Sequence, residues 1–305
     1  MRVKKKMSLQ PLSQSILKMK NSHLQHVFFL TLATFFISTS GVLGKHINMP
    51  TEIIIWWRSI LAALFLFIYC KIKNINLSFN YKKDSGTFII SALFMAAHWV
   101  TYFYALKLSS VALAMLSLYT FPIIIAILEP LFVKTKLDYV HIILGAIVLI
   151  GIYILAPAFD LNNDDVKGVL FGLFSAICYA LRILILKKHV KNYNGTMLML
   201  YQIILITIIL SPVLYFMDGS GIKSELPFVL LLALLTTAIG HTMFIKSLKH
   251  FKASAASIIS SAQPIFGIIL AFFFLNEIPT WNTFYGGLLI VSTVIIESVR
   301  SQKNK

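Results

Sequence analysis

Four side chains that can carry positive charge stand inside long apolar stretches of the sequence: Arg58, His98, Arg182 and His241. A guanidinium can hold a carboxylate through two parallel hydrogen bonds. An imidazole can hydrogen-bond a polar solute or carry a proton near neutral pH. Each type also has a structural use, because a histidine can pack against a backbone carbonyl and an arginine can extend its head group to a polar boundary. The four residues are therefore candidates for ligand binding, with a packing role as the alternative.

Aromatic and polar side chains accompany these four residues. Tyr102 follows His98 by four positions, so a helix places both on one face, and Trp99 lies beside that face. Rings with polar tips suit the wall of a binding pocket, although they are also ordinary packing residues. Further candidates for the pocket are Tyr119, Ser40 and Gln263, and the candidates for a helix bend or gate at mid-span are Pro122 and Pro264.

The composition indicates which elements position these residues. Hydrophobic residues make up 58% of the 305-residue chain and charged residues 12%, with a mean hydropathy of +0.83. A soluble domain carries about twice that charged fraction. The net charge of +16 resides in short connectors between apolar runs, which argues against a nucleic-acid-binding face. The two cysteines form no CxxC or His/Cys cluster, so we expect no metal site, and nothing indicates a cofactor or a catalytic residue.

Ten apolar runs are suited to crossing a membrane as helices, each of which needs about 20 residues. Turn residues or charges separate them. The sequence therefore predicts an all-α integral membrane protein with ten transmembrane helices in contact with the lipid bilayer. The runs cover residues 27–44, 52–70, 86–106, 109–132, 139–157, 168–186, 196–216, 226–248, 252–275 and 281–299.

The distribution of lysine and arginine predicts the orientation of these helices. If the N-terminus is cytoplasmic, 21 of the 27 Lys and Arg residues fall on the cytoplasmic side, four fall in outside connectors and two lie within spans. Cytoplasmic segments are enriched in these residues. We therefore expect a multi-pass protein of the cell (inner) membrane with both termini in the cytoplasm.

The second half of the chain repeats the first at a fixed offset along the sequence. Each half has five spans, which is an odd number, so the second half enters the membrane from the opposite side. Inverted repeats of this kind are typical of secondary transporters. The matched pairs, all separated by this one offset, are Lys45 with Lys187, Lys107 with Lys249, Ala114 with Ala256, Pro122 with Pro264 and Gly145 with Gly287.

Short segments near the ends and bends of the predicted helices form a signature in each half. The first half contains Tyr104-Ala105-Leu106-Lys107 and Phe121-Pro122, and the second contains Gln263-Pro264 and Asn276-Glu277. These segments resemble the ten-helix EamA branch of the drug/metabolite transporter superfamily, whose second helix often carries an arginine where Arg58 stands. The resemblance implies a secondary transporter of small metabolites, often an exporter, with a central cavity between helices of both halves.

The repeat also predicts how the chain is divided. Residues 1–26 form a basic cytoplasmic tail, 27–157 the first EamA-like five-helix repeat and 158–167 an outside connector. Residues 168–299 form the second EamA-like repeat, and 300–305 form a cytoplasmic tail.

The expected function is transport of a small-molecule substrate by alternating access. Polar groups within the spans are mostly cationic or neutral, which favours an amino acid or a related zwitterionic or anionic solute. Coupling to a proton or another ion, and assembly as a homodimer, are both compatible with the sequence. A channel is the main alternative. A membrane-embedded enzyme is less favoured, because no HExxH, GxSxG or pair of aspartates occurs within the spans.

Overall fold

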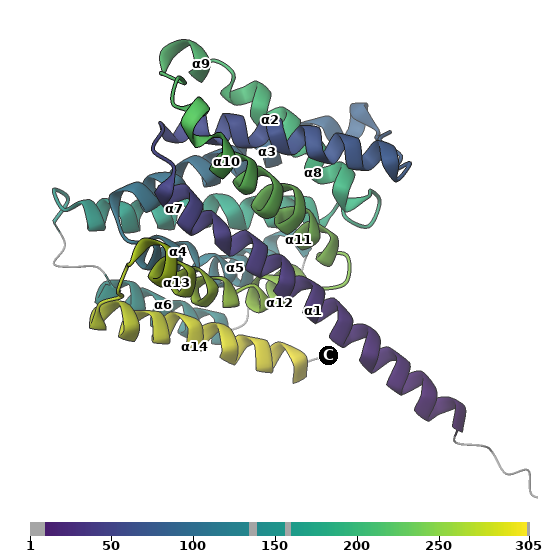
Figure 1. Cartoon of the computed structure of the whole chain (residues 1–305). Coiled ribbons are helices and arrows are strands. Elements are labelled where there is room, and N and C mark those ends of the chain that lie inside the picture. Colours follow the sequence, from purple (N-terminus) through teal and green to yellow (C-terminus); the bar gives the residue numbers. More distant parts are fainter. Residues whose placement is uncertain (1–9, 134–138, 156–159, 304–305) are drawn as a thin grey trace, which may run out of the picture.

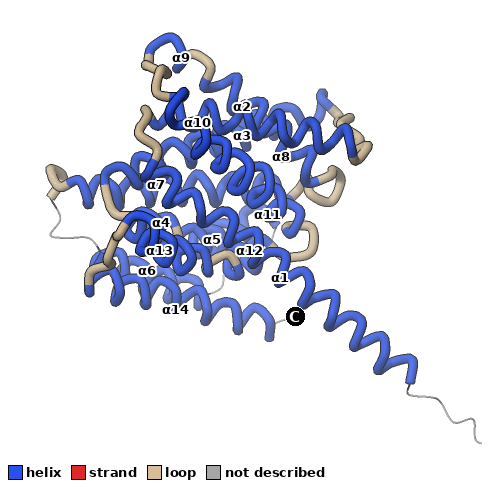
Figure 2. Tube along the Cα trace, viewed as in Figure 1, coloured by secondary structure: helices blue, strands red, loops and turns tan. Residues whose placement is uncertain are grey.

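A computed structural model of the chain describes residues 10–133, 139–155 and 160–303. Every regular element within these residues is a helix, and Figure 2 shows the helices joined by short loops. Helices are the expected solution for apolar segments, because a membrane offers no water to satisfy backbone N–H and C=O groups. The predicted all-α class is confirmed.

The helices form two consecutive sets. In each set several short helices combine into one crossing, namely α4 with α5, α8 with α9, α10 with η1 and α11, and α12 with α13. Each set therefore crosses five times. The first set comprises α1 (Gln10–His46), α2 (Thr51–Ile72), α3 (Tyr81–Leu108), α4 (Val111–Leu118), α5 (Phe121–Val133) and α6 (Tyr139–Leu155). The second comprises α7 (Asp164–Lys187), α8 (Gly195–Leu210), α9 (Val213–Phe216), α10 (Ile222–Leu231), η1 (Leu232–His241), α11 (Thr242–Ser247), α12 (Ala253–Ile259), α13 (Ala262–Leu275) and α14 (Trp281–Lys303).

Eight of the ten crossing segments are long and apolar enough to span a membrane over the described residues. The other two are α6, whose apolar part Ile143–Ile154 is shorter, and α14, which packs along α6 at one edge of the bundle (Figure 1). α1 is helical from residue 10, within the predicted tail, and its first turns project from the bundle in Figure 1. The predicted boundary at residues 157 and 158 lies outside the described residues.

The helix boundaries repeat at the same offset as the sequence. α4 begins at Val111 and α12 at Ala253, while α6 begins at Tyr139 and α14 at Trp281, so both pairs of helices keep the offset of the matched lysines and prolines. Because each set has an odd number of crossings, equivalent helices run in opposite directions. The predicted architecture of two inverted five-helix repeats is confirmed.

Both crossings that contain a mid-span proline are interrupted. The breaks lie at residues 119–120 and 260–261. Pro122 and Pro264 stand in the first turns of α5 and α13, where the missing N–H has no intrahelical partner to lose. The sequence made both prolines candidates for a helix bend or gate. Each proline stands at the start of a second short helix, just after a break.

The eighth crossing changes its helical type in the middle. The ten residues of η1 form a π-helix, in which hydrogen bonds span five residues. The side-chain hydroxyl of Thr237 also donates across five residues, to the carbonyl of Leu232 at 3.4 Å. Such segments are rare and occur frequently at functional sites. η1 ends at His241, one of the candidate binding residues.

α7 lies against α3 and α4 of the opposite half. Two of its glycines face serines at close range. A Cβ added at Gly168 would lie 2.6 Å from the Cβ of Ser109, and one added at Gly172 would lie 2.8 Å from the Cβ of Ser117. Glycines four residues apart let membrane helices approach closely. The two halves therefore meet along a small-residue face of α7.

Polar contacts join the halves at both ends of the bundle. At one end, named here the Glu277 end, the Glu277 carboxylate accepts a hydrogen bond from the backbone N–H of Val111 at 2.8 Å. At the opposite end, named the His189 end, Tyr193 donates its hydroxyl to Asp84 Oδ2 at 2.5 Å, and His189 Nδ1 lies 3.8 Å from Asp84 Oδ1. Partial burial lowers the pKa of His189, opposed by the nearby carboxylate of Asp84.

Candidate functional site

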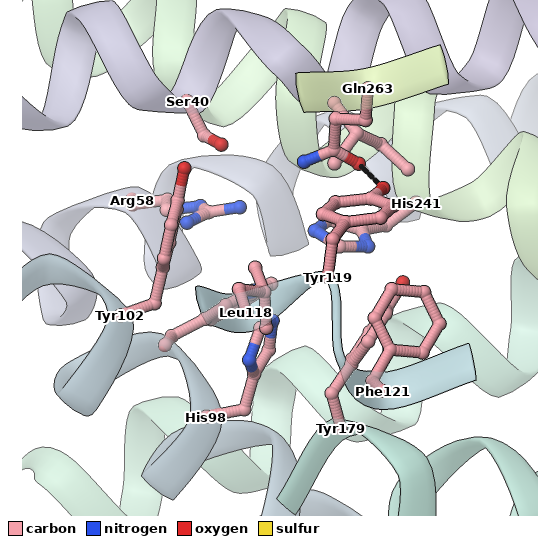
Figure 3. A pocket seen from close by; sticks show the side chains of 12 residues that line it. Ser40, Arg58, His98, Tyr102, Leu118, Tyr119, Phe121, Tyr179, His241 and Gln263 are labelled. Carbon is pink, nitrogen blue, oxygen red and sulfur yellow. Dashed lines mark hydrogen bonds between the residues drawn. The ribbon is translucent and has the colours of Figure 1, made fainter. Parts of the chain in front are cut away.

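A cavity lies where the two halves meet, and Figure 3 shows the side chains that converge on it. Its volume is about 10 Å³, which is room for about one water molecule. Each lining residue is at most 5% exposed, so the site is sealed from solvent. The lining residues are Ile37, Ser40, Arg58, His98, Trp99, Tyr102, Leu118, Tyr119, Phe121, Tyr179, His241 and Gln263.

Six of the lining residues form three repeat-equivalent pairs. Equivalent positions of an inverted repeat lie around the axis that relates the two halves. The cavity therefore sits on this axis, although nine of its twelve lining residues come from the first half and three from the second. The pairs, each related by the repeat offset, are Ile37 with Tyr179, Trp99 with His241, and Phe121 with Gln263.

Arg58 of α2 is 1% exposed and does not reach a polar boundary. Its Nε donates to Thr237 Oγ1 of η1 at 2.5 Å. Its guanidinium carbon lies 3.9 Å from the centroid of the Trp99 ring, a cation–π contact. Its Nη2 has no hydrogen-bond partner among the described residues. The guanidinium is thus fixed in orientation but retains an unused donor inside the bundle.

His98 of α3 is tied to α7. The Ser175 hydroxyl donates to the backbone carbonyl of His98 at 2.8 Å, and His98 Nδ1 lies 2.7 Å from the same Ser175 oxygen. Because the serine has a single proton, Nδ1–H must be the donor in the second bond. A neutral imidazole then has Nε2 as its acceptor. The ring also stacks on Tyr179, with centroids 4.3 Å apart.

The second half contributes His241 and Gln263. His241 ends η1, lies 5.5 Å from Trp99 between ring centroids, and has no hydrogen-bond partner for Nδ1 among the described residues. Tyr119, at the break between α4 and α5, donates its hydroxyl to Gln263 Oε1 at 2.6 Å, the dashed line in Figure 3. Helix breaks in both halves thus place polar side chains at the cavity.

The structure brings most of the predicted binding residues together. Pro122 and Pro264 do not line the cavity, but each directly follows a lining residue. In Figure 3 the Tyr102 hydroxyl points toward Ser40. The eight predicted residues that line the cavity are Ser40, Arg58, His98, Trp99, Tyr102, Tyr119, His241 and Gln263.

Arg182 is the predicted residue that does not line the cavity. It is fully buried on α7. Its guanidinium carbon lies 5.6 Å from the Tyr179 ring, and that ring belongs to the cavity wall. Its Nη2 donates to Gln202 Oε1 of α8 at 2.8 Å. Arg182 therefore stands behind Tyr179.

The sequence did not identify Tyr179 or Phe121 as binding residues. Phe121 could have been found by subtracting the repeat offset from Gln263. Tyr179 had a weaker signal, because it precedes Arg182 by three residues and so shares its helical face.

A family model described as the EamA-like transporter family matches this chain twice, at residues 24–156 and 166–298. The two matched regions cover most of the chain, and they are related by the same offset as the helices. The chain belongs to the EamA-like transporter family. This transporter is therefore a multi-pass membrane protein that moves a small-molecule substrate, and it is not an enzyme.

The transporter is similar over most of its length to several known proteins. It is 23% identical to an uncharacterized transporter of Archaeoglobus fulgidus, over 88% of this chain and 94% of the relative. It is 21% identical to the pseudopaline exporter CntI of Pseudomonas aeruginosa, with the same coverage. It is 24% identical to the S-adenosylmethionine uptake transporter of Rickettsia conorii, over 91% and 94%. One solved crystal structure superimposes with a TM-score of 0.71 over 92% of this chain and 99% of its own, at 15% identity, which shows the shared fold.

Proposed function

We propose that this transporter carries a small metabolite with a carboxylate, such as an amino acid or a related zwitterionic or anionic solute, by alternating access. The observation that carries the proposal is the buried Arg58, whose Nη2 has no hydrogen-bond partner among the described residues. The residues that line the cavity include no aspartate or glutamate. A substrate carboxylate would supply both an acceptor and the opposite charge.

Energetics support this assignment. A buried charge without a partner costs several kcal/mol, and a hydrogen bond between charged groups contributes about 1.5–3 kcal/mol. Thr237 accepts a hydrogen bond from Nε of Arg58, and the Trp99 ring faces the Arg58 guanidinium, so the orientation of this planar, fork-shaped group is already fixed. An oriented planar fork is suited to binding a carboxylate through two hydrogen bonds.

The aromatic residues that line the cavity suit the ammonium group of a zwitterion. The rings of Tyr102, Tyr119 and Tyr179 line it together with Trp99. Aromatic faces attract ammonium groups. An amino acid would therefore meet an arginine at its carboxylate and aromatic rings at its ammonium group.

The burial of the cavity favours a carrier over a channel. Every lining side chain is buried, so a solute can enter or leave only when the helices rearrange. A channel would require a continuous pore. We propose export because one relative is named an exporter. Another relative is named an uptake transporter, so a sided transport assay has to decide the direction.

Substitution of Arg58 tests the proposal. The purified transporter is first heated with L-alanine, L-glutamate, L-lactate, succinate or choline, since a ligand of the folded state raises the unfolding temperature. The probe that stabilises most is then followed by counterflow into proteoliposomes, which is saturable for a carrier. Arg58→Gln should weaken binding roughly tenfold to a hundredfold. Arg58→Lys should weaken it less, because lysine keeps the charge but loses the fork.

Lys167→Gln is the matched control, because it removes a partly exposed cation whose ion pair among the described residues is with Asp164. It should leave binding unchanged. Equal binding by wild type and Arg58→Gln, or stabilisation by choline alone, would contradict the proposal.

A further inference from the structure

A second buried arginine lies outside the cavity in surroundings that resemble those of Arg58. Arg182 Nη2 donates to Gln202 Oε1 at 2.8 Å. Gln202 is held in this orientation because its Nε2 donates to the carbonyl and the hydroxyl of Ser91, at 3.3 and 3.1 Å. Nε and Nη1 of Arg182 have no hydrogen-bond partner among the described residues. None of the ion pairs of the described residues includes Arg182.

A chain of ring contacts connects the two arginines. The guanidinium carbon of Arg58 lies 3.9 Å from the Trp99 centroid, and the Trp99 and His241 centroids are 5.5 Å apart. The His241 and Tyr179 centroids are 6.3 Å apart. The Tyr179 centroid lies 5.6 Å from the guanidinium carbon of Arg182. The two cations therefore flank one cluster of rings, with Arg58 in the cavity wall and Arg182 behind Tyr179.

The charge of this region is unbalanced. Asp84 is the one acidic side chain that is buried among the described residues, and Tyr193 engages it at the His189 end. Arg58 and Arg182 thus share the interior without a counter-ion from the described chain. A solute with one carboxylate would balance one guanidinium and leave the other desolvated and unpaired, which costs several kcal/mol. A solute with two anionic groups would balance both.

We infer that the transported solute carries two anionic groups, one held by Arg58 and the other by Arg182, as in a dicarboxylate or an amino dicarboxylate. The inference rests on the proposed binding of a carboxylate at Arg58 and deepens it. Tyr179 stands between the cavity and Arg182, so its ring has to turn aside for the second group to reach the guanidinium. Arg182 makes the site selective, because a monocarboxylate bound at Arg58 gains nothing from it.

Matched pairs of acids test this inference. Ligand affinities of the purified transporter are obtained from unfolding temperatures with malonate, succinate, glutarate and adipate. The partners are propionate, butyrate, valerate and hexanoate, which have the same numbers of carbons and a single carboxylate. At least one dicarboxylate should bind at least tenfold more tightly than its partner, and Arg182→Gln should abolish the difference. The Arg58→Gln/Arg182→Gln double variant lacks both arginines, so any change that the acids cause in its unfolding temperature measures the non-specific effect of anions.

Gln202→Glu is the sharper variant. It places a carboxylate where an amide oxygen now accepts from Arg182 Nη2 at 2.8 Å, so it neutralises the arginine without removing it. The new ion pair with Arg182 should offset the loss of the Nε2 hydrogen bonds to Ser91, so that the protein still folds, whereas the preference for dicarboxylates should be lost. This variant keeps the inference testable if Arg182→Gln fails to fold.

The outcomes separate the inference from the proposed function. Equal binding of both acid series by wild type, or a dicarboxylate preference that survives Gln202→Glu, overturns the inference. If dicarboxylates bind no more tightly than monocarboxylates and only Arg58→Gln weakens both series, Arg58 remains an anion site and the role of Arg182 is packing. If no acid of either series binds, the proposed function fails as well.

Discussion

The two cavity histidines use their ring nitrogens differently. His98 Nδ1 is bonded within the protein, to Ser175 at 2.7 Å. His241 Nδ1 has no partner among the described residues. A buried polar atom without a partner costs about 1–3 kcal/mol, so His241 gains more than His98 from a hydrogen bond to a solute. We therefore assign His98 mainly to the fold and His241 mainly to binding.

Replacing each histidine by phenylalanine, which keeps a ring, separates these roles. His98→Phe should lower the free energy of unfolding by about 0.5–1.5 kcal/mol, because one buried hydrogen bond is lost. His241→Phe should leave stability nearly unchanged and weaken substrate binding by up to about tenfold. Ser175→Ala is the control and should lower stability by at least as much as His98→Phe, because it removes both hydrogen bonds between Ser175 and His98. Thermal unfolding with and without ligand measures both effects, and identical profiles for the two histidine variants would contradict the assignment.

At the residue scale, the sequence predicts the polar part of the site better than the apolar part. Arg58 and His98 stand out because charged and polar side chains inside apolar spans are costly. Phe121 and Tyr179 do not stand out, because an aromatic residue in such a span is usually a packing residue. Arg182 was expected in the same pocket as Arg58. It lies three residues beyond Tyr179, about 4.5 Å further along the helix, and this displacement puts it behind the ring.

At the element scale, α7 depends on its glycines. A Cβ at Gly172 would lie 2.8 Å from the Cβ of Ser117 in α4, a contact that a rotamer change of the serine does not relieve. Gly168 makes a similar approach to Ser109. An added methyl group would therefore push α7 away from the opposite half.

Gly172→Ala tests this close approach. It should destabilise the protein by about 1–3 kcal/mol, the usual range for overpacking. Gly86→Ala is the matched control on α3, since a Cβ there meets nothing within 4 Å. The control should be neutral or stabilising by up to about 1 kcal/mol, because alanine favours helix more than glycine does. Thermal unfolding of both variants provides the measurement, and equal effects would show that α7 has room to shift.

The sequence predicts the crossings but not their internal irregularities. Hydropathy indicates which segments lie within the membrane, and all ten apolar runs correspond to helical crossings. It does not report the backbone hydrogen-bond pattern. The breaks before Pro122 and Pro264 and the π-helix η1 were therefore not foreseen in detail. These irregularities nevertheless position Tyr119 and His241 at the cavity.

At the scale of the whole molecule, the inverted repeat is visible in individual contacts. Lys45 donates to the carbonyl of Ser109 at the Glu277 end. Lys187, its equivalent at the other end, donates to the carbonyl of Phe251, which is the equivalent of Ser109. Equivalent contacts at opposite ends are expected of two halves that share one fold in opposite orientations. The ends therefore differ chiefly in their loops.

The loops predict which end faces the cytoplasm. Most of the lysines and arginines among the described residues lie at the His189 end. Of those that the sequence assigns to the cytoplasmic side, the ones outside the described residues are Arg2, Lys4, Lys5, Lys6, Lys134, Lys136 and Lys305. Cytoplasmic loops are enriched in these residues. We therefore expect the His189 end to face the cytoplasm and the Glu277 end to face outward. Cys70 and Cys178 are both buried and can be replaced to give a background without cysteine.

Single cysteines in this background test the orientation with a thiol reagent that does not cross membranes. Asn162 and Ser220 are exposed in loops at the Glu277 end, and Lys83 and Asn192 are exposed at the His189 end. Asn162→Cys and Ser220→Cys should be labelled in intact cells, whereas Lys83→Cys and Asn192→Cys should be labelled only after permeabilisation. Permeabilised cells serve as the control, because all four variants should then react. The reverse pattern would invert the orientation and leave the fold intact. Labelling of both Asn162→Cys and Asn192→Cys in intact cells would contradict the five-crossing halves, because α7 alone separates these two positions.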